Sequence, residues 1–270
     1  MEQLVHSGLP LYLDETSLIL AISASLKLES YSRKVTGDMK GLLACEQCID
    51  AKAPFYDVYR DIAYPKDQAL FQKYGYRYDI TVILPGLAGG ECKKTSGHYH
   101  GFNPTHTNTY GEVYEVLKGN ALYILQKCGD FESHPDRVKI EDLYAVRVNE
   151  GQSIIIPPNY GHASINIGYG PLIFSNLALI SCPVLYDAIK SHQGMAYYVF
   201  REEGRLRFHQ NPHYEDLPKL KNAVVRQNPA LGIEFGKPVY QSFVENPQAF
   251  DFLANPDPYI DAIMELLMIT

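Results

Sequence analysis

Residues 112–127 read EVYEVLKGNALYILQK, and this stretch decides the fold class. It is rich in β-branched and aromatic residues that partly alternate with polar ones, a pattern typical of β-strands. We therefore predict strands over 112–118 and 120–127. The tripeptide Lys118-Gly119-Asn120 between them predicts a tight hairpin turn.

Further short segments with the same character occupy the middle of the chain. Glycines and prolines separate them, as at Pro157-Pro158. Many short strands with such turns are typical of an all-β barrel or sandwich. The additional predicted strands are 78–85, 144–148, 153–156, 172–180 and 196–200.

The two ends of the chain have a different pattern. Residues 14–50 contain segments compatible with helices, and Asn246-Pro247 and Asp257-Pro258 each resemble an N-cap followed by proline at the first helical position. We predict a partly helical N-terminal extension over 1–50 and a barrel over 51–200. A C-terminal extension over 201–270 is expected to pack its short helices on the barrel or on a partner subunit. One apolar helix stripe in it comprises Ile260, Ile263, Met264 and Leu267.

The composition narrows the possible functions. The 270 residues carry a formal net charge of −7 and no basic block, so binding to nucleic acid or to an anionic membrane is not expected. No apolar run reaches the roughly 18 residues that a membrane span needs, and the N-terminus lacks the features of a signal peptide. Five cysteines, an odd number, favour a reducing cytoplasm over a disulfide framework. We interpret the C-x-x-C pair Cys45 and Cys48 as two thiols on a helix face.

Two histidine-containing segments carry the chemistry. His98 and His100 are two residues apart, so on a strand both imidazoles point to the same face. Glu112 begins a strong predicted strand, and His162 begins a later one. Three imidazoles and one carboxylate in one barrel would bind a divalent ion and leave positions open for water or substrate. An H-x-H pair alone more commonly consists of two histidines on the surface or in ordinary polar contacts of the core. The added glutamate and histidine favour a metal site.

The remaining histidines have no comparable partners. For each of them a solvated or hydrogen-bonded imidazole is the better interpretation. They are His6, His106, His134, His192, His209 and His213, of which His106 lies between the two halves of the motif.

The same segments resemble the two cupin motifs and, more narrowly, the cupin-type glucose-6-phosphate isomerases of archaea and some bacteria. The shared words are TVILPG, ECKKTSGHYH, GEVYEVLKGNALYILQ and IIPPNYGHASINIG, and the resemblance covers about residues 33–190. It implies a single cupin barrel, a double-stranded β-helix or jelly roll. It also implies a metal-dependent aldose–ketose isomerase that interconverts glucose 6-phosphate and fructose 6-phosphate in glycolysis and gluconeogenesis. The expected cofactor is one divalent ion per subunit, Fe²⁺ first and otherwise Mn²⁺, Ni²⁺ or Zn²⁺, in a cytoplasmic homodimer.

The resemblance also assigns roles to individual residues. The implied metal ligands are His98, His100, Glu112 and His162. From the residues themselves we expect Glu112, the inward carboxylate, to act as acid/base, with His162 and Tyr114 as further catalytic residues. The sequence leaves both an enediol route and a hydride shift open. The implied substrate contacts are Thr81, Thr95 and Gly97 for the phosphate, Tyr56, Tyr114 and Tyr186 for the sugar, and Lys94 as added positive charge. Strand alternation allows only one of Lys93 and Lys94 to face inward, and a solvated edge is an equally good interpretation of both.

Glu115 and Glu91 compete for the carboxylate role. Strand alternation places Glu112 and Tyr114 on one face and Glu115 on the other. The match of Glu112-Val113-Tyr114 to the family motif favours Glu112, and Glu91 is a weaker candidate near the rim.

Two departures from the family pattern concern the pocket. Eleven residues separate His100 from Glu112, which is longer than the family spacing, so the loop 102–111 must bulge outward. Val184 and Ala178 stand where the family has a histidine and a tyrosine.

Three alternatives therefore stay open: an isomerase or epimerase of another sugar phosphate, a non-catalytic sugar-phosphate-binding protein, and a metal-dependent dioxygenase. The Lys-Thr-x-Gly sequence argues against the dioxygenase.

Overall fold

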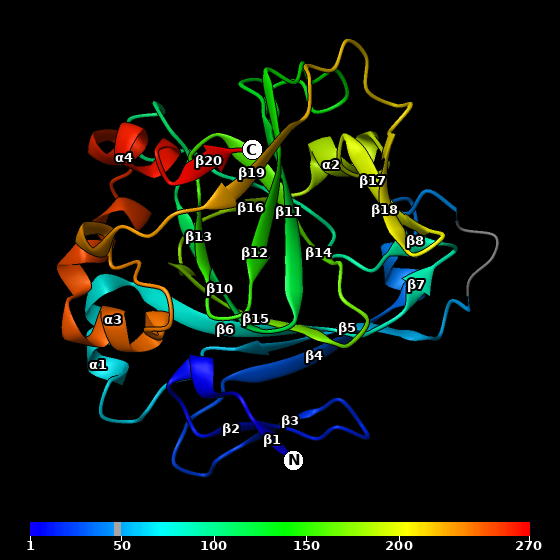
Figure 1. Cartoon of the computed structure of the whole chain (residues 1–270). Coiled ribbons are helices and arrows are strands. Elements are labelled where there is room, and N and C mark those ends of the chain that lie inside the picture. The colour runs from blue at the N-terminus through cyan, green and yellow to red at the C-terminus, as the bar shows by residue number, and fades with distance from the viewer. Residues whose placement is uncertain (46–49) are drawn as a thin grey trace.

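A computed structural model describes residues 1–45 and 50–270 (Figure 1). Two antiparallel-rich sheets form most of the molecule and enclose one apolar core. Cys48 lies outside the described residues, so the interpretation of the C-x-x-C pair stays a prediction.

The first sheet has six strands in the order β13-β10-β15-β6-β5-β4, and all neighbours are antiparallel. Strand β10, between β13 and β15, is buried on both faces because one face lines the barrel and the other lies under the chain extensions. The strands are β4 (Ser30–Val35), β5 (Pro54–Arg60), β6 (Tyr76–Ile83), β10 (Glu112–Lys118), β13 (Ser153–Ile156) and β15 (Leu172–Leu179).

The second sheet has five strands in the order β14-β11-β12-β19-β20. Side chains from the two sheets meet inside the barrel, where the rings of Tyr114 and Tyr123 lie 5.4 Å apart. This arrangement confirms the predicted mainly β, cupin-type jelly roll. The strands are β11 (Asn120–Lys127), β12 (Asp142–Asn149), β14 (Tyr160–Asn166), β19 (Lys221–Val225) and β20 (Leu267–Ile269).

The predicted hairpin at Lys118-Gly119-Asn120 is wrong. β10 pairs with β13 and β15, whereas β11 pairs with β12 and β14, so the tripeptide carries the chain from one sheet to the other. Gly119 has φ +90°, and a Cβ there would lie 2.7 Å from the carbonyl oxygen of Pro171. A glycine turn between two apolar segments marks a sharp reversal, but it does not specify which strands pair afterwards.

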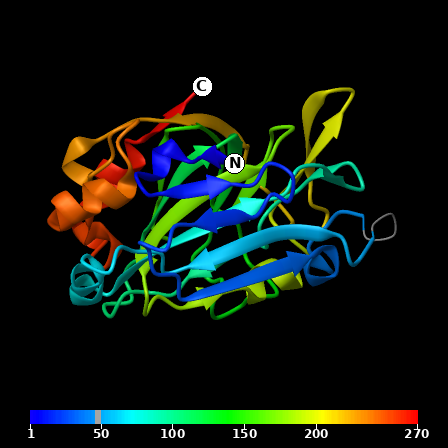
Figure 2. The same cartoon turned by 90° about the horizontal axis from the view of Figure 1, so that it is seen from below.

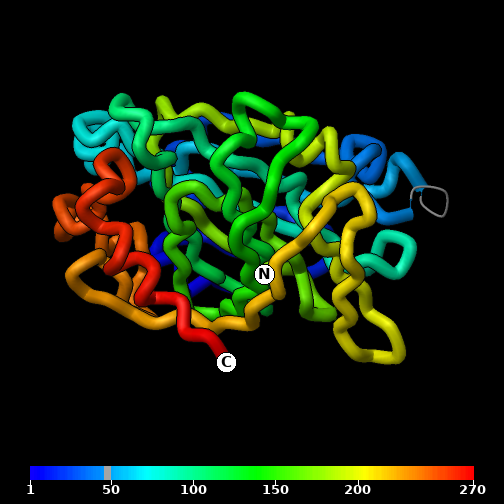
Figure 3. Tube along the Cα trace, turned by 90° about the horizontal axis from the view of Figure 1, so that it is seen from above, coloured from blue at the N-terminus to red at the C-terminus, as the bar shows by residue number. Residues whose placement is uncertain are grey.

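All predicted strands in the middle of the chain are confirmed, with shifts of a few residues at their ends. The last of them, β17 (Tyr197–Glu202), belongs to a separate four-stranded sheet that projects from one end of the barrel (Figures 1 and 3). The other members are β7 (Leu87–Ala88), β8 (Glu91–Cys92) and β18 (Arg205–Gln210). Short β9 (Tyr99–His100) pairs with β16 (Val184–Leu185), and helix α2 (Asp187–Ser191) follows.

The N-terminal extension contains more strand than helix. Three short strands, β1 (Glu2–Gln3), β2 (Leu11–Leu13) and β3 (Leu20–Ile22), form a small sheet on the outer side of the first large sheet (Figures 1 and 2). The helix expected within 14–50 is limited among the described residues to the 3₁₀ turn η2 (Thr36–Met39). β4 belongs to the barrel sheet, because its pairing with β5 outweighs the local preference of a mixed sequence.

The C-terminal extension covers the outer face of the first sheet (Figure 3). Val113 and Leu177 on that face pack in the same apolar cluster as Phe243 and Phe250 of the extension. Its helices are η3 (Pro229–Leu231), α3 (Val239–Glu245), η4 (Pro247–Leu253), η5 (Asp257–Tyr259) and α4 (Ile260–Met264), and α1 (Gln68–Tyr74) lies beside them. Every helix in the described part of the chain is too short or too polar to cross a bilayer.

Two details of the predicted C-terminal helices differ. Asn246 is the N-cap of η4, as predicted, but Asp257 lies inside η5 and Pro256 is the N-cap residue. Leu267 is not part of a helical stripe, because the chain leaves α4 and pairs with β19 instead.

Candidate metal and sugar-phosphate site

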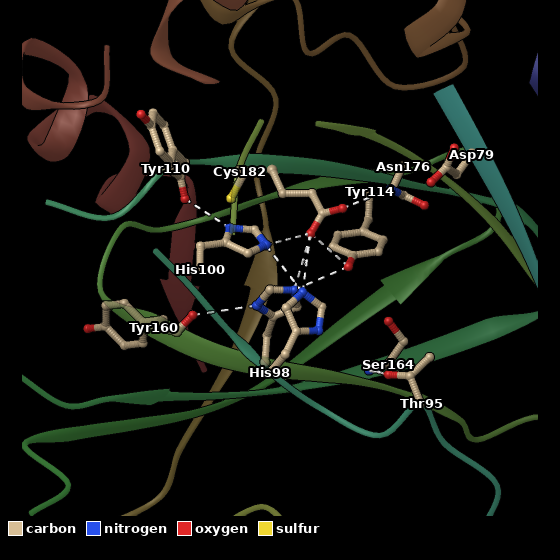
Figure 4. A network of polar contacts seen from close by, with 12 residues as sticks. Asp79, Thr95, His98, His100, Tyr110, Tyr114, Tyr160, Ser164, Asn176 and Cys182 are labelled. Carbon is tan, nitrogen blue, oxygen red and sulfur yellow. Dashed lines mark hydrogen bonds and ion pairs between the residues drawn. The ribbon is translucent and has the colours of Figure 1, made fainter. Parts of the chain in front are cut away.

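Four side chains with metal-binding atoms converge inside the barrel (Figure 4). His98 and His100 lie beside β14, Glu112 begins β10, and His162 lies on β14. One ligand atom from each of the four lies within 4.8 Å of every other. The structure therefore brings together the whole set that the sequence predicted.

The imidazole Nε2 atoms face the Glu112 carboxylate. Glu112 Oε2 lies 3.1 Å from His100 Nε2, 3.3 Å from His162 Nε2 and 3.9 Å from His98 Nε2. The Nε2 atoms of His98 and His100 are 3.2 Å apart. Three nitrogen donors and one oxygen donor around one point form a set suited to a divalent transition metal.

Neighbouring groups orient these donors. The Nδ1 atom of His100 lies 2.9 Å from the carbonyl oxygen of Tyr110, to which it donates, so Nε2 is the ring nitrogen that faces the cluster (Figure 4). Asn176 donates to Glu112 Oε1 at 2.8 Å, and Tyr114 donates to Glu112 Oε2 at 2.9 Å. His100 and Glu112 are thus each held by a polar contact outside the cluster, and His162 Nδ1 lies 3.5 Å from the Tyr160 carbonyl oxygen, as is usual around metal ligands.

The electrostatics favour the metal-binding protonation states of His98, His162 and Glu112. Burial, together with the neighbouring imidazoles, lowers the pKa of His98 well below its ordinary value, and burial lowers the pKa of His162. Burial opposes ionisation of Glu112, but hydrogen bonds from His100 and His162 hold its pKa well below the usual range. Burial opposes protonation of His100, but its hydrogen bond with Glu112 raises its pKa above the ordinary value. Neutral His98 and His162 and an ionised Glu112 are forms that bind a metal, and His100 would release its proton to join them.

A pocket opens beside the four donors. Its wall includes all the residues that the sequence assigned to phosphate and sugar contacts except Lys94: Tyr56, Thr81, Thr95, Gly97, Tyr114 and Tyr186. Thr95 Oγ1 accepts a hydrogen bond from the Ser164 amide at 3.0 Å, which leaves its own hydroxyl hydrogen free to donate. Gly97 has φ +77°, and a Cβ there would lie 2.8 Å from Met195 Sδ, so only glycine fits without displacement.

Lys94 is placed outside this pocket, which corrects the expectation that it faces the phosphate. Its side chain is buried, contacts the Glu91 carboxylate and lies over the Tyr198 ring. Lys93 turns the other way and donates to the Pro54 carbonyl oxygen. A buried lysine is stable only when it is paired, and Glu91 supplies that partner here rather than serving the metal site.

Four polar residues of the pocket were missed. Arg60, Arg77, Asp79 and Asn176 all line it, and Asp79 Oδ2 lies 2.9 Å from Arg60 Nη1 and 3.0 Å from Arg77 Nε. A signal was present, because counting back from Thr81 in steps of two along its strand places Asp79 and Arg77 on the same face. Asn176 is likewise a polar interruption of an apolar strand.

The structure also places the competing carboxylate, the two altered pocket positions and His106. Glu115 faces away from the pocket and accepts a hydrogen bond from the Val239 amide, so the choice of Glu112 as the inward carboxylate is confirmed. Val184 and Ala178, the positions that depart from the family pattern, both line the pocket. His106 is exposed and takes no part in the cluster of four.

Comparisons with known proteins agree with this geometry. The family model described as glucose-6-phosphate isomerase matches residues 33–216. The glucose-6-phosphate isomerase of Pyrococcus furiosus is 28% identical over 51% of this chain and 64% of its own length. The enzymes of Pyrococcus abyssi and Pyrococcus horikoshii are 26% and 25% identical over 66% and 62% of this chain, and each alignment covers 85% of the relative. Among solved structures, hazelnut vicilin aligns with a TM-score of 0.34 and 14% identity over 53% of this chain and 34% of its own. The chain therefore belongs to the glucose-6-phosphate isomerase family.

Proposed function

We propose that the protein is a metal-dependent glucose-6-phosphate isomerase whose active site is the pocket described above. The observation that carries the proposal is the convergence of His98, His100, Glu112 and His162 beside a pocket that is also lined by Thr95 and Gly97. Family membership supports the substrate pair, glucose 6-phosphate and fructose 6-phosphate.

In this proposal, the four clustered residues have separate roles in metal binding and in proton transfer. Isomerisation of the open-chain aldose moves one hydrogen from C2 to C1, as a proton through an enediolate or as a hydride, and one proton from O2 to O1. His98, His100, His162 and Glu112 would hold a divalent ion, which when bound acts as a Lewis acid toward the substrate oxygens. Glu112 is the acid/base in this proposal, because its carboxylate is the one in the cluster and is ionised, so it has no proton of its own and can accept one.

Tyr114 and Asn176 support that role. Tyr114 Oη lies 2.9 Å from Glu112 Oε2 and 3.1 Å from His162 Nε2, so it can relay a proton or hold both groups in place. Asn176 fixes the other carboxylate oxygen. The position of the base therefore does not depend on the substrate.

The phosphate would lie against Thr81, Thr95 and the Gly97 backbone, with the sugar against Tyr56 and Tyr186. Hydroxyls and a glycine backbone are suitable donors for a phosphate dianion. Arg60 and Arg77 line the same pocket and share one acidic partner, Asp79. Because two cations share one carboxylate, they give the pocket a local positive charge, although the net charge of the chain is −7.

The finer assignments are also proposals. We infer Fe²⁺ as the native ion, with Mn²⁺, Ni²⁺ and Zn²⁺ as alternatives that the same ligands accept. We further propose a cytoplasmic homodimer that acts in glycolysis and gluconeogenesis without nucleic-acid or membrane partners. The net charge of −7 supports the last point.

A coupled assay with fructose 6-phosphate tests the proposal, run before and after EDTA treatment and after addition of Fe²⁺ or Mn²⁺, with metal analysis of the same samples. We expect activity that EDTA removes and metal restores, and no activity in His162→Ala. Full activity in metal-free protein would contradict the metal dependence.

Two further measurements test the substrate and the base. Because Ala178 and Val184 alter the pocket wall, a panel of other hexose and pentose phosphates run in parallel tests the substrate. In deuterated water, the absence of solvent deuterium at C2 of the product would count against Glu112 as a proton shuttle.

A further inference from the structure

The long loop between His100 and Glu112 is bound by the C-terminal extension. The Asp257 carboxylate accepts hydrogen bonds from four loop side chains, two at each oxygen. Oδ1 accepts from Asn103 at 3.0 Å and Asn108 at 2.9 Å, and Oδ2 accepts from Thr105 at 3.3 Å and Thr107 at 3.0 Å. These donors also hold the pKa of Asp257 below its ordinary value, with Asn108 as the largest contributor.

A second contact joins the same two segments next to the metal ligand. A Cβ on Gly111, the residue before Glu112, would lie 3.3 Å from the Phe252 carbonyl oxygen and 3.4 Å from its ring. Phe252 belongs to η4 of the extension and is fully buried in the apolar cluster between the extension and the first sheet. The extension therefore fixes the loop both at its tip and at the point where it enters β10.

The loop in turn holds one of the metal ligands. Within the loop, the Asn103 amide donates to the Asn108 carbonyl oxygen at 2.8 Å. Closer to the barrel, the Tyr110 amide donates to the Gly101 carbonyl oxygen at 3.2 Å. The carbonyl oxygen of Tyr110 then accepts from His100 Nδ1 at 2.9 Å, which sets the tautomer and the ring orientation of His100. The contacts run without a break from Asp257 through the loop to His100.

We propose that Asp257 is a positioning residue for the metal site: it orders the loop 101–111 so that the Tyr110 carbonyl aims His100 Nε2 at the ion. This inference rests on the proposed metal dependence. It gives the C-terminal extension a role in the chemistry although residues 217–270 lie outside the family match, which ends at 216. The long loop and the C-terminal extension both depart from the family pattern, and in this proposal the conformation of the loop depends on the extension.

Titration of the apoprotein with Mn²⁺ tests whether Asp257 affects metal affinity. Electron paramagnetic resonance measures the concentration of free Mn²⁺. We expect the unaltered chain to bind one Mn²⁺, Asp257→Ala to bind it about tenfold more weakly, and Thr107→Val to be weakened in the same direction. Asp251→Ala is the matched control, because Asp251 accepts hydrogen bonds from Asn255 and Tyr259 within the same extension. It should bind Mn²⁺ like the unaltered chain.

Hydrogen exchange supplies the second readout. Amides of residues 103–110 should exchange faster in Asp257→Ala than in Asp251→Ala, while those of β10 and β14 keep their protection. Equal Mn²⁺ affinity in Asp257→Ala and the unaltered chain would overturn the inference and leave the proposed function intact. Failure of the unaltered chain to bind Mn²⁺, Fe²⁺ or Zn²⁺ would overturn the proposed function as well. If Asp257→Ala does not fold, Thr107→Val, which removes only an exposed hydroxyl, decides the result.

Discussion

Replacing Glu115 by glutamine should stabilise the protein at neutral pH. Glu115 lies on the face of β10 opposite Glu112, its side chain is only 1% exposed, and in residues 1–45 and 50–270 it forms no ion pair. Its Oε2 accepts a hydrogen bond from the Val239 amide at 3.0 Å, a contact that the amide oxygen of glutamine can reproduce. Ser175 lies opposite Glu115 on the neighbouring strand β15, and among the described residues its hydroxyl has no hydrogen-bond partner, so we expect the glutamine amide to donate to it.

The magnitude follows from the two pKa values. Burial raises the pKa of Glu115 from 4.5 to about 8 in the folded protein. The stability that this raised pKa provides is complete below pH 4.5 and is lost as the pH rises through about 8, because the unfolded chain ionises first. At pH 7 the loss is about 3 kcal/mol, since each pKa unit corresponds to about 1.4 kcal/mol. Glutamine does not titrate, so Glu115→Gln should avoid this loss.

Urea unfolding at pH 4.5, 7 and 8.5 measures the effect. The free energy of unfolding of Glu115→Gln should match that of the unaltered chain at pH 4.5 and exceed it by about 3 kcal/mol at pH 7. Glu132→Gln, at an exposed position, is the control and should change stability by less than about 0.5 kcal/mol at each pH. A variant whose stability depends on pH as steeply as that of the unaltered chain would refute the reasoning.

Three other changes probe the site and the fold. His98→Ala should lower the metal content from one ion per chain to almost none while leaving the far-ultraviolet circular dichroism unchanged; retained metal would contradict the ligand assignment. Asn176→Ala should weaken Mn²⁺ binding by about 10- to 100-fold because Glu112 loses the donor to its Oε1, and an unchanged affinity would remove Asn176 from the site. Gly119→Ala should lower the free energy of unfolding by more than about 1 kcal/mol, because its φ of +90° and the Pro171 carbonyl oxygen exclude a Cβ. Gly170→Ala, where a Cβ meets nothing within 4 Å, should leave urea unfolding nearly unchanged, and equal effects of the two glycine variants would be inconsistent with this explanation.

Short-range periodicity determined much of this protein from its sequence. Side chains two residues apart on a strand share a face, so the sequence alone placed His98 beside His100 and Glu112 beside Tyr114, with Glu115 on the other side. The metal ligands were accessible to sequence reasoning for this reason. Local β-branched and aromatic composition also predicted the strands in the middle of both sheets, but not β4, β5, β19 or β20.

Tertiary structure decided which segments meet. Lys118-Gly119-Asn120 is a sharp turn in either a hairpin or a sheet-to-sheet crossing, and only the pairing of β10 and β11 with distant strands distinguishes them. Lys94 turned away from the pocket because a buried ammonium needs a carboxylate, and the fold brings Glu91 to it. Asp257 accepts a hydrogen bond from Thr107, which lies 150 residues earlier in the chain. Such contacts depend on how the whole chain packs, and no local pattern in the sequence encodes them.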